Sequence, residues 1–222
     1  MTTMDAWHFL PETVAFLREL RENNDKEWFT ANRDRYEALM KQPGEVFASL
    51  VGDALAGVID QPVKSKVFRV HRDVRFSKDK TPYKPHIHIL FAPSGVEGGP
   101  KWFFGLEPDR VAVGTGVFTF EKEALIRYRD RVAGEDGEAL QAALDRLLNE
   151  NTYMYDPALK RVPSGYPSDH PRAELLRRKG IAIWSRLEGP DVVTSGDAVA
   201  TVVAAQARLK PVFDWLMQDA EG

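Results

Sequence analysis

The sequence contains no cysteine and no apolar run long enough to cross a membrane. The missing thiols exclude disulfides, thiolate metal ligands and a cysteine nucleophile, and they fit a reducing compartment. A bilayer-spanning helix needs about 20 consecutive apolar residues. The start of the chain, MTTMDAWHFLPET, also lacks the basic, apolar and small-residue order of a signal peptide. We therefore expect a cytoplasmic protein with no membrane partner.

The familiar nucleotide-binding and nucleophile motifs are missing as well. Neither G-x-x-x-x-G-K-[ST] nor G-x-G-x-x-G occurs, and Gly114-Thr115-Gly116 lacks the third glycine, so it fits a bulge or bend in a strand better. No serine lies in a G-x-S-x-G elbow. These absences disfavour serine catalysis and nucleotide binding by either familiar loop, and no cofactor is expected.

Apolar residues follow helical spacing toward both ends of the chain and alternate with a period of two in the middle. The 222 residues, 43% of them hydrophobic, suffice for one domain with a sizeable core. Helices are predicted over 10–20, 28–40, 45–58, 121–132, 137–148 and 197–217, with Pro43-Gly44 ending the second and Pro211 kinking or restarting the last.

Strands are predicted at 67–70, 87–91, 102–106 and 111–120. The gaps between these strands are too short for helical crossovers, which favours an antiparallel sheet. The stretch 151–190, rich in proline, glycine and charge, carries no predicted element. The pattern predicts a single α+β domain over residues 1–222, with an antiparallel sheet flanked by N-terminal and C-terminal helices.

Positive charge is concentrated in two segments of an acidic chain. Between Lys64 and Lys84 eight cations face two aspartates, a balance of +6, although the whole chain carries −3. Between Lys160 and Arg186 seven cations face two acids, a balance of +5, so the remainder sums to −14. Such segregation can arise by chance, but a shared anion-binding cleft would require it. The hypothesis is that the two segments converge.

The first basic segment is predicted to present arginine forks. On a strand, the side chains of Arg69, His71, Asp73 and Arg75 would share one face. Guanidinium forks match phosphate or carboxylate oxygens in bidentate fashion. The alternative is a solvated, lysine-rich edge strand in which Asp73 pairs internally with Arg72 or Arg75.

The following stretch, Ser77 to Lys84, is predicted to be a loop. Asp79 can form a side-chain turn there, and Pro82 fixes its own backbone and restricts the residue before it. Backbone N–H groups, the hydroxyls of Ser77 and Thr81 and the lysine side chains could together cradle an oxyanion.

Three further interpretations use the same segment. His71, Asp73, His86 and His88 form an H-x-D and an H-x-H pair that could bind zinc, but the surrounding positive charge would repel a cation, so no metal site is expected. Alternatively, Asp73 could orient His71 for acid–base chemistry. The rings of Phe68, Phe76 and Tyr83, interleaved with the cations, could stack on single-stranded nucleic acid. Core packing is the plainer interpretation of those rings, and the acidity of the chain argues against a general DNA coat.

Asn23-Asn24 precedes Trp28-Phe29 at a predicted helix boundary. The favoured interpretation is that these asparagines cap the next helix. The alternative is that one of their amides helps to orient a ligand. Trp28 and Phe29 are expected to be core anchors.

The longest distinctive stretch is Arg72-Asp73-x-Arg75-Phe76-Ser77-Lys78-Asp79-Lys80-Thr81-Pro82-Tyr83-Lys84. Before it stand Asn23-Asn24, Trp28-Phe29, Arg33 and Tyr36-Glu37; after it stand Gly114-x-Gly116, Leu159-Lys160-Arg161-x-Pro163-x-Gly165-Tyr166, Asp169-His170-Pro171 and Leu175-Leu176-x-x-Lys179. With these stretches, residues 8–217 resemble an uncharacterised bacterial and fungal family, the domain of unknown function numbered twenty-four sixty-one. That family has no settled activity, so the resemblance implies a fold and motif residues but no reaction.

Both basic segments overlap the stretches that carry the resemblance, which supports a common site. We expect an anionic, phosphate-bearing ligand to bind there in a basic cleft. The expected ligand-binding residues are Arg72, Arg75, Ser77, Lys78, Lys80, Tyr83, Lys84, Lys160 and Arg161, and the catalytic candidates are Asp73, Asp79 and His170. Phosphoester hydrolysis or transfer is the reaction that such positioned charge would serve. Two alternatives stay open, a nucleic-acid-binding accessory protein and a non-catalytic module that docks an acidic protein partner.

Overall fold

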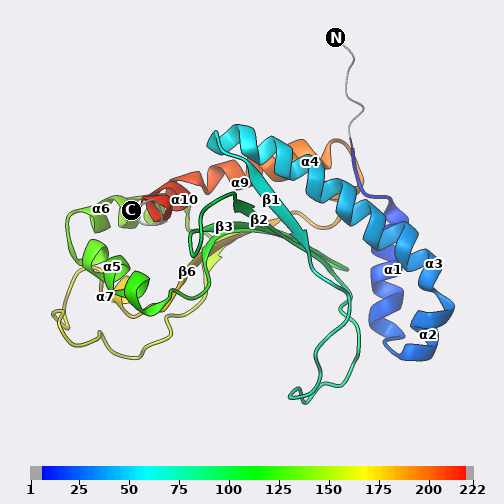
Figure 1. The fold of residues 1–222 in the computed structure, drawn as a ribbon, viewed down its shortest axis with the longest axis horizontal. Coiled ribbons are helices and arrows are strands. Elements are labelled where there is room, and N and C mark those ends of the chain that lie inside the picture. The colour runs from blue at the N-terminus through cyan, green and yellow to red at the C-terminus, as the bar shows by residue number, and fades with distance from the viewer. Residues whose placement is uncertain (1–6, 219–222) are drawn as a thin grey trace, which may run out of the picture. The chain divides into compact units, whose positions relative to one another are not determined.

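The computed structural model describes residues 7–218 (Figure 1). Residues 1–6, which begin the segment predicted not to be a signal peptide, and residues 219–222 lie outside the described part. The helices are α1 (Pro11–Glu22), α2 (Lys26–Ala31), α3 (Arg33–Tyr36), the π-helix η1 (Glu37–Lys41), α4 (Gln42–Ile59), α5 (Lys122–Ala133), α6 (Asp136–Leu147), α7 (Ala173–Leu176), α8 (Asp191–Thr194), α9 (Ala198–Arg208) and α10 (Lys210–Met217). Between residues 7 and 218, no helix has the length and apolar character needed to cross a membrane.

The strands form one sheet in the order β1-β2-β3-β4-β6-β5. They are β1 (Val63–Val67), β2 (Ile87–Pro93), β3 (Lys101–Glu107), β4 (Arg110–Val117), β5 (Thr152–Met154) and β6 (Ile181–Leu187). β1 pairs antiparallel with β2, with Val63 opposite Pro93, and β5 pairs antiparallel with β6, with Thr152 opposite Ser185. The predicted α+β class with an antiparallel sheet is confirmed.

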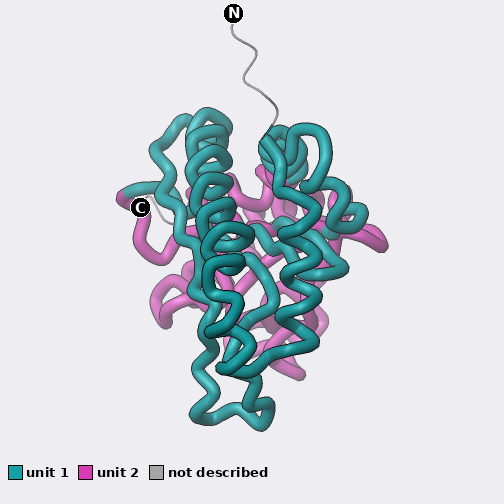
Figure 2. The backbone as a smooth tube through the Cα atoms, turned by 90° about the vertical axis from the view of Figure 1, so that its right-hand side faces the viewer, with its two compact units in different colours: residues 1–94, 103–113, 186–205 teal, residues 95–102, 114–185, 206–222 magenta. Residues whose placement is uncertain are grey.

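The chain divides into two compact units, each assembled from separate segments (Figure 2). Unit 1 contains residues 1–94, 103–113 and 186–205, and unit 2 contains residues 95–102, 114–185 and 206–222. The first basic segment lies in unit 1, and nearly all of the second lies in unit 2. That the whole chain is one domain stays a prediction.

Aromatic side chains form the centre of unit 1. Phe9, Phe47 and Phe104 are buried, with ring centroids 5.0 Å apart for Phe9 and Phe47 and 4.7 Å apart for Phe47 and Phe104. α4 lies on β1 and β2, and its glycines allow a close approach: a Cβ atom on Gly44 would lie 3.4 Å from the Ile87 side chain. The first basic segment therefore begins on a strand, β1, that packs against α4 of the same unit.

Helical structure in unit 1 continues through Pro43-Gly44, so the predicted break there is wrong. The N–H of Gln42 donates to the Glu37 carbonyl, five residues back, which defines the π-helix η1. A proline has no N–H and crowds the carbonyl four residues earlier. The wider turn just before Pro43 relieves that conflict, and π-turns of this kind are frequent at functional sites.

Unit 2 packs α5, α6 and α10 around buried aromatic rings. Trp102 stacks on Phe213 with centroids 4.6 Å apart, and Phe120 stacks on Tyr128 at 4.7 Å. α10 begins at Lys210 with Pro211 in its first turn, which confirms the predicted restart of the last helix. Unit 2 also holds β5 and most of β6, which were not predicted.

Glycine lets β6 approach β4 closely. Gly116 has φ +138°, and a Cβ atom on it would lie 2.0 Å from the Ile181 carbonyl oxygen. The bend predicted at Gly114-Thr115-Gly116 is therefore part of β4, at the place where the backbone of β6 passes.

Candidate functional site

β1 ends at Val67, and residues 68–86 form a long connection that projects beyond the strand ends before β2 begins (Figure 1). The predicted strand face of Arg69, His71, Asp73 and Arg75 is therefore wrong. A regular ladder would need N–H donors from the returning arm, and Pro82 and Pro85 have none.

The base of the connection is pinched together. His71 forms an isolated antiparallel bridge with Tyr83, and the N–H of Arg72 donates to the Pro82 carbonyl at 2.8 Å. We call the residues from Arg72 to Lys84 the finger.

Side chains brace the finger from within. Arg72 donates to the Asp79 carboxylate at 2.5 Å, to the Thr81 carbonyl at 3.1 Å and to the Thr81 hydroxyl. Asp79 also accepts from the Thr81 N–H at 3.0 Å, so the predicted side-chain turn is confirmed. The Thr81 N–H above all, and then Arg72, lower the pKa of Asp79 to about 2. Asp79 is thus ionised at neutral pH and serves the structure of the finger.

Asp73 pairs with Arg75, as the alternative interpretation predicted. Its carboxylate accepts from Arg75 Nε at 3.0 Å and from Nη2 at 2.7 Å, and this pairing lowers the pKa of Asp73. No hydrogen bond between Asp73 and His71 occurs within residues 7–218. Both carboxylates predicted as catalytic candidates in this segment are therefore held by arginines of the finger.

The other finger residues predicted to bind a ligand differ in their contacts. Lys80 Nζ donates to the Val74 carbonyl at 3.0 Å, and the Ser77 N–H contacts the same oxygen at 3.3 Å. Lys78 and Lys84 form no ion pair with any described residue. Ligand binding by these residues stays a prediction.

Asn24, just before α2, binds the backbone of the finger and does not cap the helix. Asn24 donates from its amide to the Tyr83 carbonyl at 3.0 Å and accepts from the Tyr83 N–H at 2.9 Å. The cap of α2 comes from Asp25, which accepts from the Trp28 N–H at 2.9 Å, so the predicted capping by Asn23-Asn24 is wrong. Because Asn24 satisfies both backbone groups of Tyr83, it ties the finger to the helices.

Aromatic stacking strengthens this connection. The ring of Tyr83, 6% exposed, stacks on Phe29 with centroids 3.9 Å apart. His71 meets both rings edge-on, at 5.9 Å from Phe29 and 5.3 Å from Tyr83. Phe29 is buried as predicted, and Trp28 is half-buried against Phe16.

Phe29, His71 and Tyr83 form one wall of a cavity of about 320 Å³, which we call the cationic pocket. Its lining consists of Lys26, Phe29, Thr30, Arg33, Tyr36, Glu37, Lys41, His71 and Tyr83. Three of these side chains are cationic and one is anionic, a balance of +2. α2, α3 and η1 thus face the base of the finger across a positively charged hollow.

The cations of the pocket are unequally neutralised. Lys41 Nζ lies 2.8 Å from the Glu37 carboxylate, so that pair is closed. Lys26 and Arg33 form no ion pair with any residue between 7 and 218. Burial raises the pKa of Tyr36, which keeps its hydroxyl protonated as a potential donor. The lining of the pocket therefore includes two unpaired cations and one tyrosine hydroxyl.

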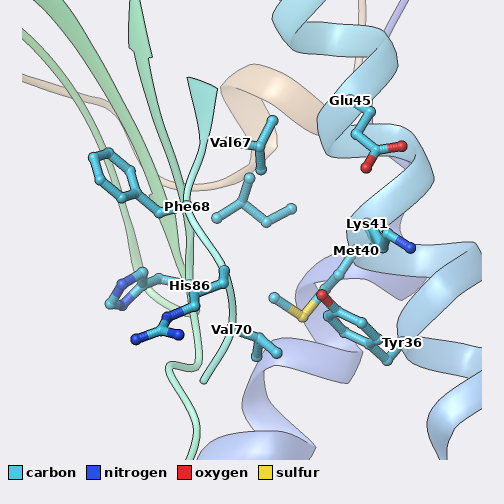
Figure 3. A pocket seen from close by; sticks show the side chains of 10 residues that line it. Tyr36, Met40, Lys41, Glu45, Val67, Phe68, Val70 and His86 are labelled. Carbon is cyan, nitrogen blue, oxygen red and sulfur yellow. The ribbon is translucent and has the colours of Figure 1, made fainter. Parts of the chain in front are cut away.

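A second cavity of about 240 Å³, the His86 pocket, adjoins the first through shared Tyr36 and Lys41 (Figure 3). It is lined by Tyr36, Met40, Lys41, Glu45, Val67, Phe68, Arg69, Val70, His86 and Ile87. Figure 3 shows Tyr36, Met40 and Lys41 on the helical side, with Val67, Phe68 and His86 across from them. The π-helix therefore contributes to the walls of both pockets.

His86, directly before β2, lines the His86 pocket and contacts a second histidine. The rings of His86 and His88 stack with centroids 3.6 Å apart. Burial, followed by the His88 charge, lowers the pKa of His86 to about 4, so His86 is neutral at pH 7. Glu107 lies 3.9 Å from His88 and 2.6 Å from Arg110, and its pKa falls to about 2, chiefly through His88.

The described residues contain no cluster of three or more His, Asp or Glu side chains arranged to hold a metal ion. Of the four residues in the metal interpretation, His71 packs against two aromatic rings and Asp73 pairs with Arg75. The other two, His86 and His88, are stacked on each other.

The second basic segment is organised around the end of a helix in unit 2. Arg172 donates to the carbonyls of Val132 at 2.6 Å, Ala133 at 3.2 Å and Gly134 at 2.9 Å. His170 accepts from the Arg172 N–H through Nδ1 at 3.0 Å, and its Nε2 lies 3.3 Å from the Ala133 carbonyl. The Arg172 guanidinium and His170 Nε2 thus contact the carbonyls at the C-terminus of α5, while Nδ1 of the same ring accepts from the Arg172 backbone. The ring of His170, a predicted catalytic residue, therefore takes part in the structure at the end of α5.

The other cations of the second segment differ in burial and in ion pairing. Arg178, 5% exposed, donates to the Tyr155 carbonyl at 2.7 Å and to Glu174 at 2.6 Å. Lys160 and Arg161 are exposed and form no ion pair within the described chain. The shared cleft stays a prediction, because the two segments belong to different units.

Sequence reasoning missed Lys26 and Lys41 as pocket residues and used Arg33 and Tyr36 for the resemblance alone. The available signal was the presence of Arg33 and Tyr36-Glu37 among the motif stretches, close to Asn23-Asn24. Positive and negative residues alternate around them in the sequence, so no excess of positive charge marks them.

The family model for "Conserved hypothetical protein (DUF2461)" matches residues 12–215. The chain belongs to the DUF2461 family. This agrees with the resemblance noted over residues 8–217, and the match includes every residue of both pockets. A comparison with curated proteins found no match.

Proposed function

We propose that this DUF2461 protein binds an anionic small molecule carrying a phosphate group in the cationic pocket of unit 1. The observation that carries the proposal is that Lys26 and Arg33 line the pocket without a carboxylate partner, whereas Glu37 is already paired with Lys41. A phosphate would supply the missing negative charge, and its oxygens match the fork of a guanidinium.

The remaining walls suit a small ligand. The volume of about 320 Å³ lies at the lower end of the range for ligand pockets. Phe29 and Tyr83 form a rigid apolar surface because Asn24 holds the Tyr83 backbone. Tyr36 adds a hydroxyl donor, so the pocket combines an aromatic floor with converging polar groups.

Phosphoester hydrolysis or transfer is the reaction class we propose for this pocket. His71 lines it, and the ring of His71 has no hydrogen-bond partner among the described residues. An imidazole can accept a proton at one nitrogen and donate one at the other. We therefore assign the proton-transfer role to His71 in preference to Asp73 or Asp79.

The test is a thermal-shift screen of the full chain against inorganic phosphate, pyrophosphate, nucleoside monophosphates and sugar phosphates. A ligand at 100 times its dissociation constant should add about 2.7 kcal/mol to the free energy of unfolding. Calorimetric titration of any hit should then show about tenfold weaker binding for Arg33→Gln, because a charge-assisted hydrogen bond is lost.

The matched control is Arg146→Gln, which removes an exposed helical arginine from α6 outside both pockets. Its affinity for the ligand should equal that of the unmodified protein. A flat screen, or equal affinities for the Arg33 and Arg146 variants, would contradict the proposal.

A further inference from the structure

The finger carries the most exposed large apolar side chain of the described residues. Phe76 is 95% exposed, and Phe68, on the same connection between β1 and β2, is 41% exposed. Core packing, the plainer interpretation of these rings, holds for Tyr83 and is wrong for Phe76 and Phe68. A single exposed apolar side chain is common on protein surfaces. These two rings differ from such a case in the cations that accompany them.

Each of the two exposed rings is accompanied by a cation. The Arg75 guanidinium lies 5.9 Å from the centroid of Phe76, and Lys66 Nζ lies 5.5 Å from the centroid of Phe68. Lys78 is exposed close by in the sequence, and Lys64 is exposed on β1, an edge strand of the sheet. Aromatic and cationic residues are thus interleaved along the chain from Lys64 to Lys78.

Hydrogen bonds brace the loop that carries Phe76. The bonds of Arg72 to Asp79 and Thr81 close the loop, and the Asn24 amide anchors its base. A preorganised loop loses little conformational entropy when it binds, so one exposed ring can contribute most of its contact energy.

We infer that the stretch from Lys64 to Lys78, with Phe76 and Phe68 as stacking platforms, binds single-stranded nucleic acid. Base stacking on aromatic rings tolerates any sequence, and cations between the rings fit a repeating phosphate backbone. A bilayer is a poorer match, because two separate rings bury little apolar area and stable anchoring takes stronger signals. The inference rests on residues other than Lys26 and Arg33 and is independent of the proposed function.

The test is fluorescence anisotropy of the full chain with labelled oligodeoxythymidine and oligouridine of about a dozen nucleotides, a length in the range of known single-strand sites. Binding should weaken about tenfold or more between about 50 mM and about 200 mM salt. Phe76→Ala should weaken it at least about fivefold, and Phe76→Trp should preserve it, since stacking needs an aromatic ring.

Three comparisons make the outcome decisive. Ile126→Ala, which removes a 51% exposed apolar side chain from α5, should leave oligonucleotide affinity unchanged. Phe76→Leu should behave like Phe76→Ala, and Phe76→Ala should keep the affinity for inorganic phosphate, which separates this inference from the cationic pocket. Equal binding by the Phe76→Ala and unmodified proteins would overturn the inference. So would the absence of oligonucleotide binding at low salt, including the case in which phosphatidylserine vesicles bind instead.

Discussion

The arginines of the two basic segments of this DUF2461 protein brace their own units, whereas the unpaired cations of the cationic pocket lie outside both segments. In unit 2, Arg172 and Arg178 donate to backbone carbonyls and Glu174. In unit 1, Arg72 and Arg75 brace the finger, while Lys26 and Arg33, outside either segment, stay unpaired in the cationic pocket. The comparison teaches that charge density along the chain does not show which cations the fold has already paired.

The largest expected effect tests the structural role of the unit 2 cations. Arg172→Ala should lower the free energy of unfolding by about 2–3 kcal/mol, because the carbonyls at the end of α5 lose a charged donor. Urea denaturation measures the change. Arg161→Ala, at an exposed and unpaired position of the same segment, should stay within about 0.5 kcal/mol. Equal effects of the two substitutions would contradict the claim that Arg172 has a structural role that Arg161 lacks.

A smaller effect is expected at the junction of the finger and helices in unit 1. Asn24→Ala should cost about 1–2 kcal/mol of unfolding free energy and speed amide exchange in the finger, because both Tyr83 backbone groups lose their partner. Asn24→Asp keeps the acceptor and should be intermediate. Asn151→Ala, which removes an exposed amide side chain in unit 2, serves as the control and should leave exchange in the finger unaltered.

Much of the fold could be predicted because its signals are local. The period of apolar residues gave α1, α5 and α6 to within a few residues, and Pro211 marked the start of α10. β6 was missed because its short apolar run, Ile181 to Trp184, stands between basic stretches and depends on contact with β4. The helical continuation through Pro43 required a π-turn, which no local pattern indicates.

The candidate site was less predictable, because it depends on pairing in space. The sequence indicated the loop at Asp79 and the pair of Asp73 with an arginine, and both are present. It could not indicate that Asn24 would bind a peptide group 59 residues away. Nor could charge counting find Lys26 and Arg33, which stand in stretches of mixed charge.

The pH dependence of stability tests the surroundings of His86 in unit 1. The pKa of His86 falls from 6.5 to about 4 on folding, so the unfolded chain binds more protons between these values. Stability should therefore decrease as the pH falls from about 6.5 toward about 4, and His86→Gln should flatten that slope. Urea midpoints across this range measure it; an unchanged slope in His86→Gln would contradict the burial of His86.

The smallest effect is confined to the finger. The folded pKa of Asp79, about 2, is below its ordinary value of 3.8, so its contribution is complete above pH 3.8 and disappears as the pH falls through about 2. The Thr81 amide, which donates to Asp79, should report this loss as a change in its NMR chemical shift. A Thr81 signal that does not titrate would show that this bond does not brace the finger.

The most direct test of the central claim is an NMR titration of the full chain with inorganic phosphate, followed through the backbone amides. We predict saturable shifts in α2, α3 and η1 and at His71 and Tyr83, all around the cationic pocket. Shifts confined to residues 159–179, or no saturable shift at any residue, would contradict the claim that the unpaired cations of unit 1 form the anion site.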